Sequence, residues 1–396
     1  MKIFKLAILA VIILANNLAQ AAALADSVNG FSWKYFRALN HDRNIFYSPY
    51  SIAAALSLVA NGATGETQRE ILNALDADSL ETLNDGFQNF RAESEKNYAD
   101  ENILRDAKLI LVSKNFIGNG INPAFRKTAE KVYGSEIRAA NFSGNLTGEK
   151  RKITAWVDKI TNHFLPNYQS SASSATVVDL LNVVYFKGKW NFPFEEYATR
   201  ERIFTGRNGE TASVPMMRQV FEEDIAYAEN EKFKAVALPY KNFSAMMYVI
   251  LPKDETDLNI ADAFDESFIA QIAAARRFNG EVDVILPKFE LDIKNSLVDD
   301  LKAIGIERAF SNGAEFSKIV EKVQLQISGA THQAKVKVDE TGTEAAAVTE
   351  FTLEATSAVP RPKTRVEFHA DRPFIFVIRD TQSGVDLFAG AVNFLK

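Results

Sequence analysis

Segments with helical periodicity fill the first half of this chain, and strand-like segments dominate from about residue 178 onward. Apolar residues recur at helical spacing in 28–39, 52–59, 83–90 and 153–164. Residues 67–70 (TQRE) have the pattern of a capping box that opens another helix. The later apolar or alternating runs, bounded by Gly, Pro and Asn, predict strands. Helices followed by strands indicate an α+β fold, and no Gly/Ser-rich or Pro-rich linker divides it.

The N-terminus has the three parts of a secretory signal peptide. Two lysines precede an apolar run at 6–15 that is too short to span a bilayer, and 19–21 (AQA) is a small-residue cleavage site. We therefore expect residues 1–21 to be removed, the protein to be secreted and extracellular, and 22–396 to form a single domain. A buried N-terminal helix is the alternative interpretation.

Charge and cysteine content exclude several classes of function. Loss of Lys2 and Lys5 with the signal would take the formal net charge from −6 to −8, which argues against nucleic acid as a partner. The chain has no cysteine, so disulfides and cysteine-based metal sites are excluded and stability must come from the core. We expect a monomer without a cofactor or metal and not associated with a membrane.

Three sequons would be available for N-glycosylation in a secreted chain. They begin at Asn141, Asn145 and Asn242. The first two lie in a polar stretch, 141–150 (NFSGNLTGEK), that we expect to be a loop. The sequence therefore predicts a glycoprotein.

No catalytic constellation is present in the sequence. A Ser-His-Asp site needs one of only four histidines, His41, His163, His332 and His369, beside a nucleophile, and the chain has no Gly-x-Ser-x-Gly elbow. Zinc-protease and phosphate-binding motifs are also missing. His332 lies in a strand-like stretch, where a hydrogen-bonded core role is the more common one. We conclude that the protein is not an enzyme.

The most unusual segment runs from 339 to 362 (DETGTEAAAVTEFTLEATSAVPRP), between two good strand patterns. Alternate residues form one face that becomes increasingly apolar, ending in Phe351 and Leu353, and a second face that carries three glutamates. Gly342 supplies a flexible hinge before this run. The pattern suggests a loop that becomes a strand under some condition, with an exposed edge strand or a disordered acidic loop as the alternatives.

The segments around this loop resemble the serpins. VKVDETGTEAAAVT (336–349) is similar to the proximal hinge of inhibitory serpins, and FHADRPFIFVI (368–378) is similar to their C-terminal signature. Five further motifs stand in the order of that family: NIFYSPYSIAAALSLVANGATGET, LLNVVYFKGKWNFPF, VPMM, LPY and LPKFE. The resemblance runs from about residue 28 to the C-terminus.

The resemblance implies a serpin fold, with three β-sheets, eight or nine helices and an exposed reactive-centre loop at about 340–366. It also implies a suicide-substrate mechanism. A serine protease attacks the loop and forms a covalent acyl-enzyme, the cleaved loop inserts as a strand into the central sheet, and distortion of the protease stops deacylation.

The resemblance also assigns roles to individual residues. The hinge comprises Glu340, Gly342, Thr343, Ala345, Ala346, Ala347 and Val348. Thr343 is small, as insertion requires, whereas Val348 departs from the usual Ala, Gly or Ser and faces outward by the alternation. The shutter, beneath the strands that open, comprises Ser48, Ser51, Asn182 and His332, and Trp190 marks the breach at the top.

The reactive bond falls between Ala355 and Arg361. The family's usual spacing from Glu340 gives Thr356-Ser357, whereas counting back from Phe368 points nearer to Val359, with Ala358-Val359 as the next best bond. Prolines follow Val359 and Arg361 directly and protect those two bonds from most serine proteases. The remaining small residues suit an elastase-like pocket.

The sequence leaves three other functions open. The first is a non-inhibitory serpin that acts as a carrier, chaperone or storage protein, although such members usually have bulky or charged hinge residues. The others are inhibition of trypsin-like proteases and inhibition of cysteine proteases. Heparin is not expected to bind, because 76–104 holds only Arg91 and Lys96 among eight acids.

Overall fold

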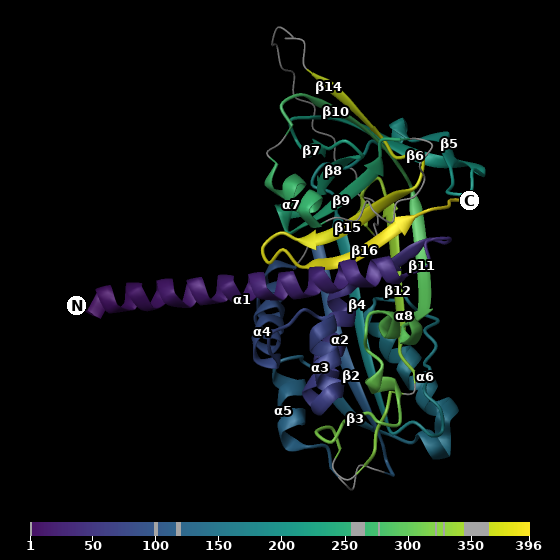
Figure 1. Cartoon of the computed structure of the whole chain (residues 1–396). Helices are drawn as coiled ribbons and strands as arrows, with labels where there is room; N and C mark the ends of the chain where they lie inside the picture. Colours follow the sequence, from purple (N-terminus) through teal and green to yellow (C-terminus); the bar gives the residue numbers. More distant parts are fainter. Residues whose placement is uncertain are drawn as a thin grey trace.

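The predicted α+β architecture is confirmed by the structure, a computed structural model in which three β-sheets pack with a set of helices (Figure 1). The structure describes residues 2–98, 102–115, 120–254, 266–275, 278–320, 323–327, 329–343 and 364–396. Side chains are described from residue 19 onward, except at Glu266. Within these residues there are eight α-helices, which agrees with the expected number.

The large sheet has six strands in the order β11-β12-β13-β4-β2-β3. They are β11 (Phe289–Ser296), β12 (Thr331–Asp339), β13 (Gly342–Thr343), β4 (Val178–Lys189), β2 (Asn102–Ser113) and β3 (Glu136–Ala140). The short strand β13 lies between β12 and β4 and is antiparallel to both. Among the described residues β12 and β4 do not pair with each other, and no described strand lies between them below β13. We call this place the open strand position.

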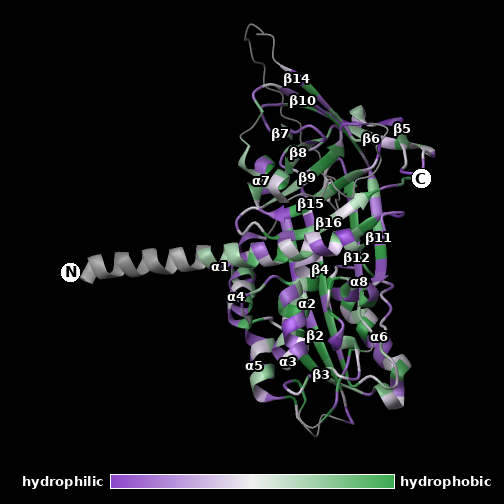
Figure 2. Ribbon diagram, viewed as in Figure 1, coloured by the Kyte–Doolittle hydropathy of each residue, from purple (hydrophilic) through white to green (hydrophobic). Residues whose placement is uncertain are grey.

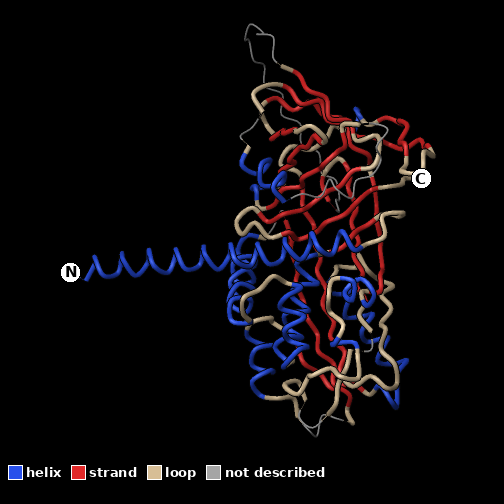
Figure 3. Tube along the Cα trace, in the orientation of Figure 1, coloured by secondary structure: helices blue, strands red, loops and turns tan. Residues whose placement is uncertain are grey.

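The other two sheets lie at the opposite end of the molecule from most helices, as Figure 3 shows. The second sheet is ordered β1-β16-β15-β9-β8-β7. Its strands are β1 (Ile45–Tyr47), β16 (Asp386–Val392), β15 (Phe374–Asp380), β9 (Ala245–Pro252), β8 (Phe233–Pro239) and β7 (Ala226–Glu229). The third sheet, ordered β14-β10-β6-β5, comprises β14 (Arg365–His369), β10 (Glu281–Pro287), β6 (Thr211–Glu222) and β5 (Arg200–Thr205).

The helices cover both faces of the large sheet, except α7 (Glu266–Ala274), which packs on β7 and β8 of the second sheet. The others are α1 (Lys2–Ala38), α2 (Pro49–Gly62), α3 (Gly65–Ala74), α4 (Leu80–Asn97), α5 (Pro123–Lys131), α6 (Phe142–Ile160) and α8 (Val298–Ala303). Two apolar cores result, a main core that includes most of α2 and the second sheet, and a smaller core between α6 and the outer face of β2 and β4. Figure 2 shows hydrophobic residues concentrated along the central strands.

Helix α2 connects the two large layers because it is apolar on nearly every side. Ser48 caps its N-terminus by accepting a hydrogen bond from the Ser51 backbone N–H at 3.1 Å, and Pro49 occupies the first helical turn, where no N–H partner is needed. The helix packs against β4 of the large sheet and β16 of the second. This contact places Ser48 and Ser51 directly below the open strand position.

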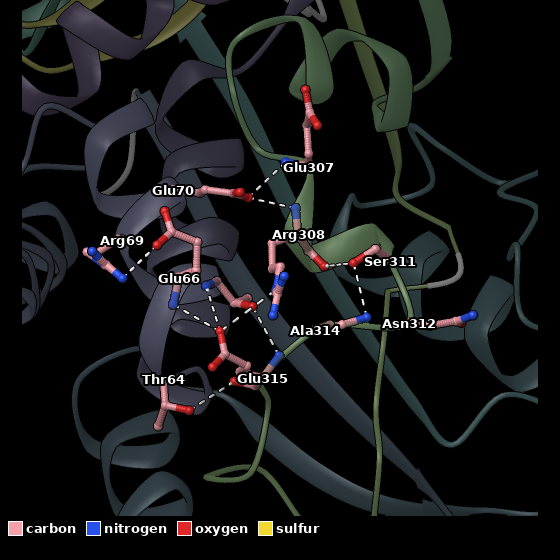
Figure 4. Close-up of polar contacts among 12 residues, drawn as sticks. Thr64, Glu66, Arg69, Glu70, Glu307, Arg308, Ser311, Asn312, Ala314 and Glu315 are labelled. Atoms are coloured by element: carbon pink, nitrogen blue, oxygen red, sulfur yellow. Dashed lines mark hydrogen bonds and ion pairs between the residues drawn. The ribbon is translucent and has the colours of Figure 1, made fainter.

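The predicted capping box at 67–70 is wrong by one helical turn. Helix α3 begins at Gly65, and Thr67 lies inside it. The carboxylate of Glu315 accepts the free N–H groups of Glu66 and Thr67, at 2.9 and 3.4 Å, in the place of a local cap (Figure 4). Glu70 instead accepts the N–H groups of Glu307 and Arg308. A residue distant in the sequence therefore performs the capping, which a local motif cannot reveal.

The predicted signal peptide forms part of α1, which continues without a break from Lys2 to Ala38 and whose first half extends away from the body (Figure 1). Its second half packs on α4, where Gln20 is hydrogen-bonded to Asp85 and Asn89 and Leu24 is buried. Cleavage after Ala21 remains a prediction. No helix of the described residues has the length and apolarity needed to cross a membrane.

Candidate functional site at the opening of the large sheet

The candidate site begins at β13, where the predicted hinge enters the large sheet. Thr343 lies opposite Val338 of β12 on one side and opposite Gly188 of β4 on the other. Gly342 has a φ of +155°, and a Cβ at that position would lie 2.1 Å from the carbonyl oxygen of Gly188. Only glycine fits such an approach of two backbones. The hinge thus fills the first position of the open strand.

The side chain of Thr343 is held in a tight aromatic pocket. It is only 3% exposed, and its hydroxyl lies 2.6 Å from the hydroxyl of Tyr240. Trp190 stacks on Tyr240 with ring centroids 4.5 Å apart, and its indole N–H donates to the carbonyl oxygen of Asp339 at 3.0 Å. The pocket therefore accepts a small polar side chain and leaves no room for a long one.

Glu340 fixes the start of the hinge through two partners outside the loop. Lys288 forms an ion pair with its carboxylate at 2.7 Å, and the hydroxyl of Thr199 donates to the other oxygen at 2.7 Å. Burial raises the pKa of this carboxyl, but Lys288 and Thr199 outweigh burial and hold the pKa below its usual value. The anchor is therefore ionised at neutral pH, and it determines where the hinge leaves β12.

The four predicted shutter residues meet below the hinge, where β4 and β12 face the start of α2. The backbone N–H of Ser48 donates to Nε2 of His332 at 3.1 Å, and the side-chain amide of Asn182 donates to the carbonyl oxygen of Ser51. His332 is buried, as the hydrogen-bonded core role requires. The cluster ties each strand beside the opening to the same helix end.

Acidification is expected to weaken this cluster. Burial lowers the pKa of His332 to about 4, so between pH 6.5 and 4 the unfolded chain binds a proton that the folded chain excludes. The stability that neutral His332 contributes is fully present above pH 6.5 and is lost as the pH falls. At pH 4 the free energy of unfolding is expected to be about 3 kcal/mol lower than at neutral pH. Urea unfolding of the wild type and of His332→Asn at pH 7 and pH 4 checks this. A wild type and a variant with equal pH dependence would contradict it.

A cavity of about 380 Å³ continues the opening below the shutter. Asn182 and His332 are among the residues that line it, and the Oδ1 atom of Asn182 is buried without a hydrogen-bond partner in the described part of the chain. Apolar side chains from α2, β4, the α8 region and the segment before β12 line it, including Leu56, Val59, Leu180, Phe316 and Ile327. Polar side chains, including Asp179, Gln324 and Thr331, line it as well, so the cavity offers both apolar and polar surface beside the open strand position.

The remaining reactive-loop predictions lie outside the described residues. These are the hinge residues Ala345, Ala346, Ala347 and Val348 and the reactive-bond residues Thr356, Ser357, Ala358 and Val359. The chain is described again from Thr364, just before β14. There Arg365 donates to the buried carboxylate of Asp283 on β10, at 2.6 Å, beside a paired hydrogen bond from Arg218. The loop thus ends at a fixed point on the third sheet.

The three sequons all lie at the surface, but the first two are not in a loop. The expected loop at 141–150 is the beginning of α6, which Asn141 caps by accepting the Gly144 N–H at 3.2 Å. Asn145 interrupts the helix with non-helical dihedral angles and is exposed. Asn242 is exposed between β8 and β9. The loop prediction is corrected, because asparagine side chains replace the missing helical partners.

Sequence reasoning missed several contact residues of the site. Tyr240 and Lys288 belong to the LPY and LPKFE motifs that carried the resemblance, yet their spacing gives no sign that they reach Thr343 and Glu340. Thr199 and Asp283 stand in no motif. The only available signal was the motif membership of the first two.

Comparison with known proteins supports the same interpretation. A family profile described as "Serpin (serine protease inhibitor)" matches residues 26–394. This chain belongs to the serpin family. Leukocyte elastase inhibitor from Bos taurus is 32% identical to this serpin over 88% of the chain and 93% of the relative.

Solved serpin structures have the same fold. Tengpin, a thermophilic serpin in its native state, superposes with a TM-score of 0.82 at 27% identity, covering 93% of each chain. Human thyroxine-binding globulin, complexed with its hormone, superposes with a TM-score of 0.82 at 25% identity, covering 95% of this serpin and 99% of the globulin. The fold therefore occurs in a protein named as a serpin and in one named for thyroxine binding.

Proposed function

We propose that this serpin is a secreted inhibitor that traps serine proteases of the elastase type as covalent acyl-enzymes. The observation that carries the proposal is the position of Thr343, a small hinge residue that pairs with both β12 and β4 at the entrance to an open strand position. Cleavage of the loop would free the chain after Thr343 to continue along that position, drawing the attached protease with it.

The bond most consistent with an elastase-like target is Thr356-Ser357, with Ala358-Val359 next. Small residues precede both bonds, and proline directly follows Val359 and Arg361. A relative named for elastase inhibition, at 32% identity, supports the same class of protease. Trypsin-like and cysteine proteases are the alternatives.

A gel assay tests this function. Incubation with porcine pancreatic elastase is expected to give a covalent complex that survives SDS and boiling, together with a C-terminal fragment that begins at Ser357. Mass spectrometry of that fragment identifies the bond. A fragment that begins at Pro362 or Thr364 would contradict an elastase-like specificity, and complex formation with trypsin alone would point to the same conclusion.

A non-inhibitory carrier is the second candidate, because thyroxine-binding globulin shares the fold. Cleavage of the loop without any covalent complex would favour it. The small, buried hinge residue argues for inhibition, since a hinge that never inserts does not require a tight pocket for its side chain.

We extend the proposal to localisation and modification. Removal of residues 1–21 and glycans on Asn141, Asn145 and Asn242 are expected in material secreted from eukaryotic cells. N-terminal sequencing and a mobility shift after glycosidase treatment measure both. Sequencing that reads Met1 would contradict secretion by this signal.

A further inference from the structure

Two lysines flank the open strand position one residue beyond the hinge. The pairing of Thr343 with Gly188 and Val338 fixes the register, so the next residue of a continuing strand, Glu344, falls opposite Lys187 of β4 and Lys337 of β12. Glu344 directly follows Thr343, whose pairs with both strands are present in the structure, so the extrapolation extends over one residue.

The same register places both ammonium groups on one face of the sheet. Thr343 faces the core, where Tyr240 lies, so Lys187 and Lys337, which are next to Gly188 and Val338, face outward. A strand that continued past Thr343 would turn Glu344 to the same side. Lower on that outer face, Leu181 and Val183 of β4 pack beneath α6. Lys187 and Lys337 lie above the area that α6 covers, and both side chains remain partly or fully exposed.

Neither lysine has a partner in the described part of the chain. No hydrogen bond or ion pair is formed by the Nζ of Lys187 or Lys337, whereas the neighbouring Lys335 pairs with Glu290 at 2.9 Å. Two strand spacings, about 10 Å, separate the two backbones, so a side chain midway is a direct cross-strand neighbour of both. Unpaired cations at this position are notable in a chain whose formal net charge is −6.

We propose that Lys187 and Lys337 form a carboxylate-binding clasp that receives Glu344 when the loop enters the large sheet. This inference rests on the proposed inhibitory function and adds two positioning residues to it. Glu344 is the first residue of the loop that must enter after Thr343, so the clasp acts at the start of insertion. The lysines attract the acidic outer face of the loop while the core below receives its apolar face.

Charge reversal and charge exchange test the clasp. The measured quantity is the consumption ratio, the number of inhibitor molecules consumed for each elastase molecule trapped. Lys187→Glu combined with Lys337→Glu is expected to raise this ratio by about tenfold, because each cross-strand ion pair changes an equilibrium by about two- to fivefold.

Adding Glu344→Lys to that double variant restores opposite charges and is expected to restore efficient trapping. Lys187→Arg with Lys337→Arg keeps the clasp and stays within about twofold of the wild type. The effect of the reversal should shrink in 1 M salt.

Arg105→Glu provides the matched control. Arg105 is exposed on β2, one strand away from the opening on the same outer face, so its reversal changes the net charge in the same direction without touching the position of Glu344. Its consumption ratio is expected to stay within about twofold of the wild type, by the small worth of an isolated exposed charge. The clasp is overturned if Lys187→Glu/Lys337→Glu has no higher consumption ratio than Arg105→Glu. It is also overturned if adding Glu344→Lys does not lower the ratio of the double variant.

A second readout separates failure of the clasp from failure of the inhibitory function. The gain in melting temperature on loop cleavage by elastase reports insertion even without a trapped protease. The gain is expected to fall in the reversed double variant and to return on charge exchange. If the melting temperature of the wild type does not rise on cleavage, both the inhibitory function and the clasp are overturned. If the wild type and the reversed double variant show the same rise, only the clasp is overturned.

Discussion

Replacement of Thr343 by arginine is expected to convert the protein from an inhibitor into a substrate of the same protease. The wild-type side chain is 3% exposed and its hydroxyl touches that of Tyr240 under the stacked ring of Trp190. A guanidinium there would be buried without a partner, which costs several kcal/mol, so the hinge would leave the sheet and the cleaved loop would insert too slowly. Complex formation on SDS gels is expected to fall by at least about tenfold while loop cleavage continues.

Thr343→Ser is the matched control for this change. Serine keeps the hydroxyl and the small volume, so the variant is expected to trap protease with nearly wild-type efficiency. Undiminished inhibition by Thr343→Arg would contradict insertion through this hinge. Failure of both variants to form a complex would instead indicate damage to the fold, which their melting temperatures would show.

Removal of two apolar side chains from the loop is expected to destabilise the cleaved form selectively. A strand that continued the register of β13 would bring Phe351 opposite Leu180 and Leu353 opposite Val178, on the core-facing side, and Leu180 and Val178 line the 380 Å³ cavity. Burial of these side chains fills that space. Phe351→Ala with Leu353→Ala is therefore expected to cost the cleaved form at least about 5 kcal/mol of unfolding free energy relative to the native form.

The opposite face of the same segment supplies the control. Glu350→Ala with Thr352→Ala changes two residues that alternate with Phe351 and Leu353 and face outward, so the cleaved form is expected to lose less than about 1 kcal/mol. Denaturant unfolding of native and elastase-cleaved protein measures each difference. Equal losses for both pairs would show that the cavity does not receive the apolar face.

The fold class and most strands could be predicted from local patterns, because alternation and helical periodicity report directly on burial. The buried face of α6, with Ile153 and Val157, and the strand β4 follow from such patterns. The predictions are wrong where a residue distant in the sequence provides the hydrogen bonds that a helix end requires. Glu315 caps α3 across 248 or more positions of sequence, and no motif in the segment 64–70 indicates this.

The residues of the candidate site were predictable as a set, but their contacts were not. The resemblance identified Ser48, Ser51, Asn182 and His332, and the structure brings them together at the start of α2. The partners of the hinge depend on how β12, β13 and β4 align. That register follows from pairing between segments some 150 residues apart, which periodicity within one segment does not encode.

Insertion of the cleaved loop between β4 and β12 is the central claim, and one comparison tests it most directly. The melting temperature of the native protein is measured beside that of the protein cleaved in its reactive loop by elastase. Insertion buries at least two large apolar side chains and completes a strand, so a rise of about 10 °C or more is expected. An unchanged or lower melting temperature after cleavage would contradict the account.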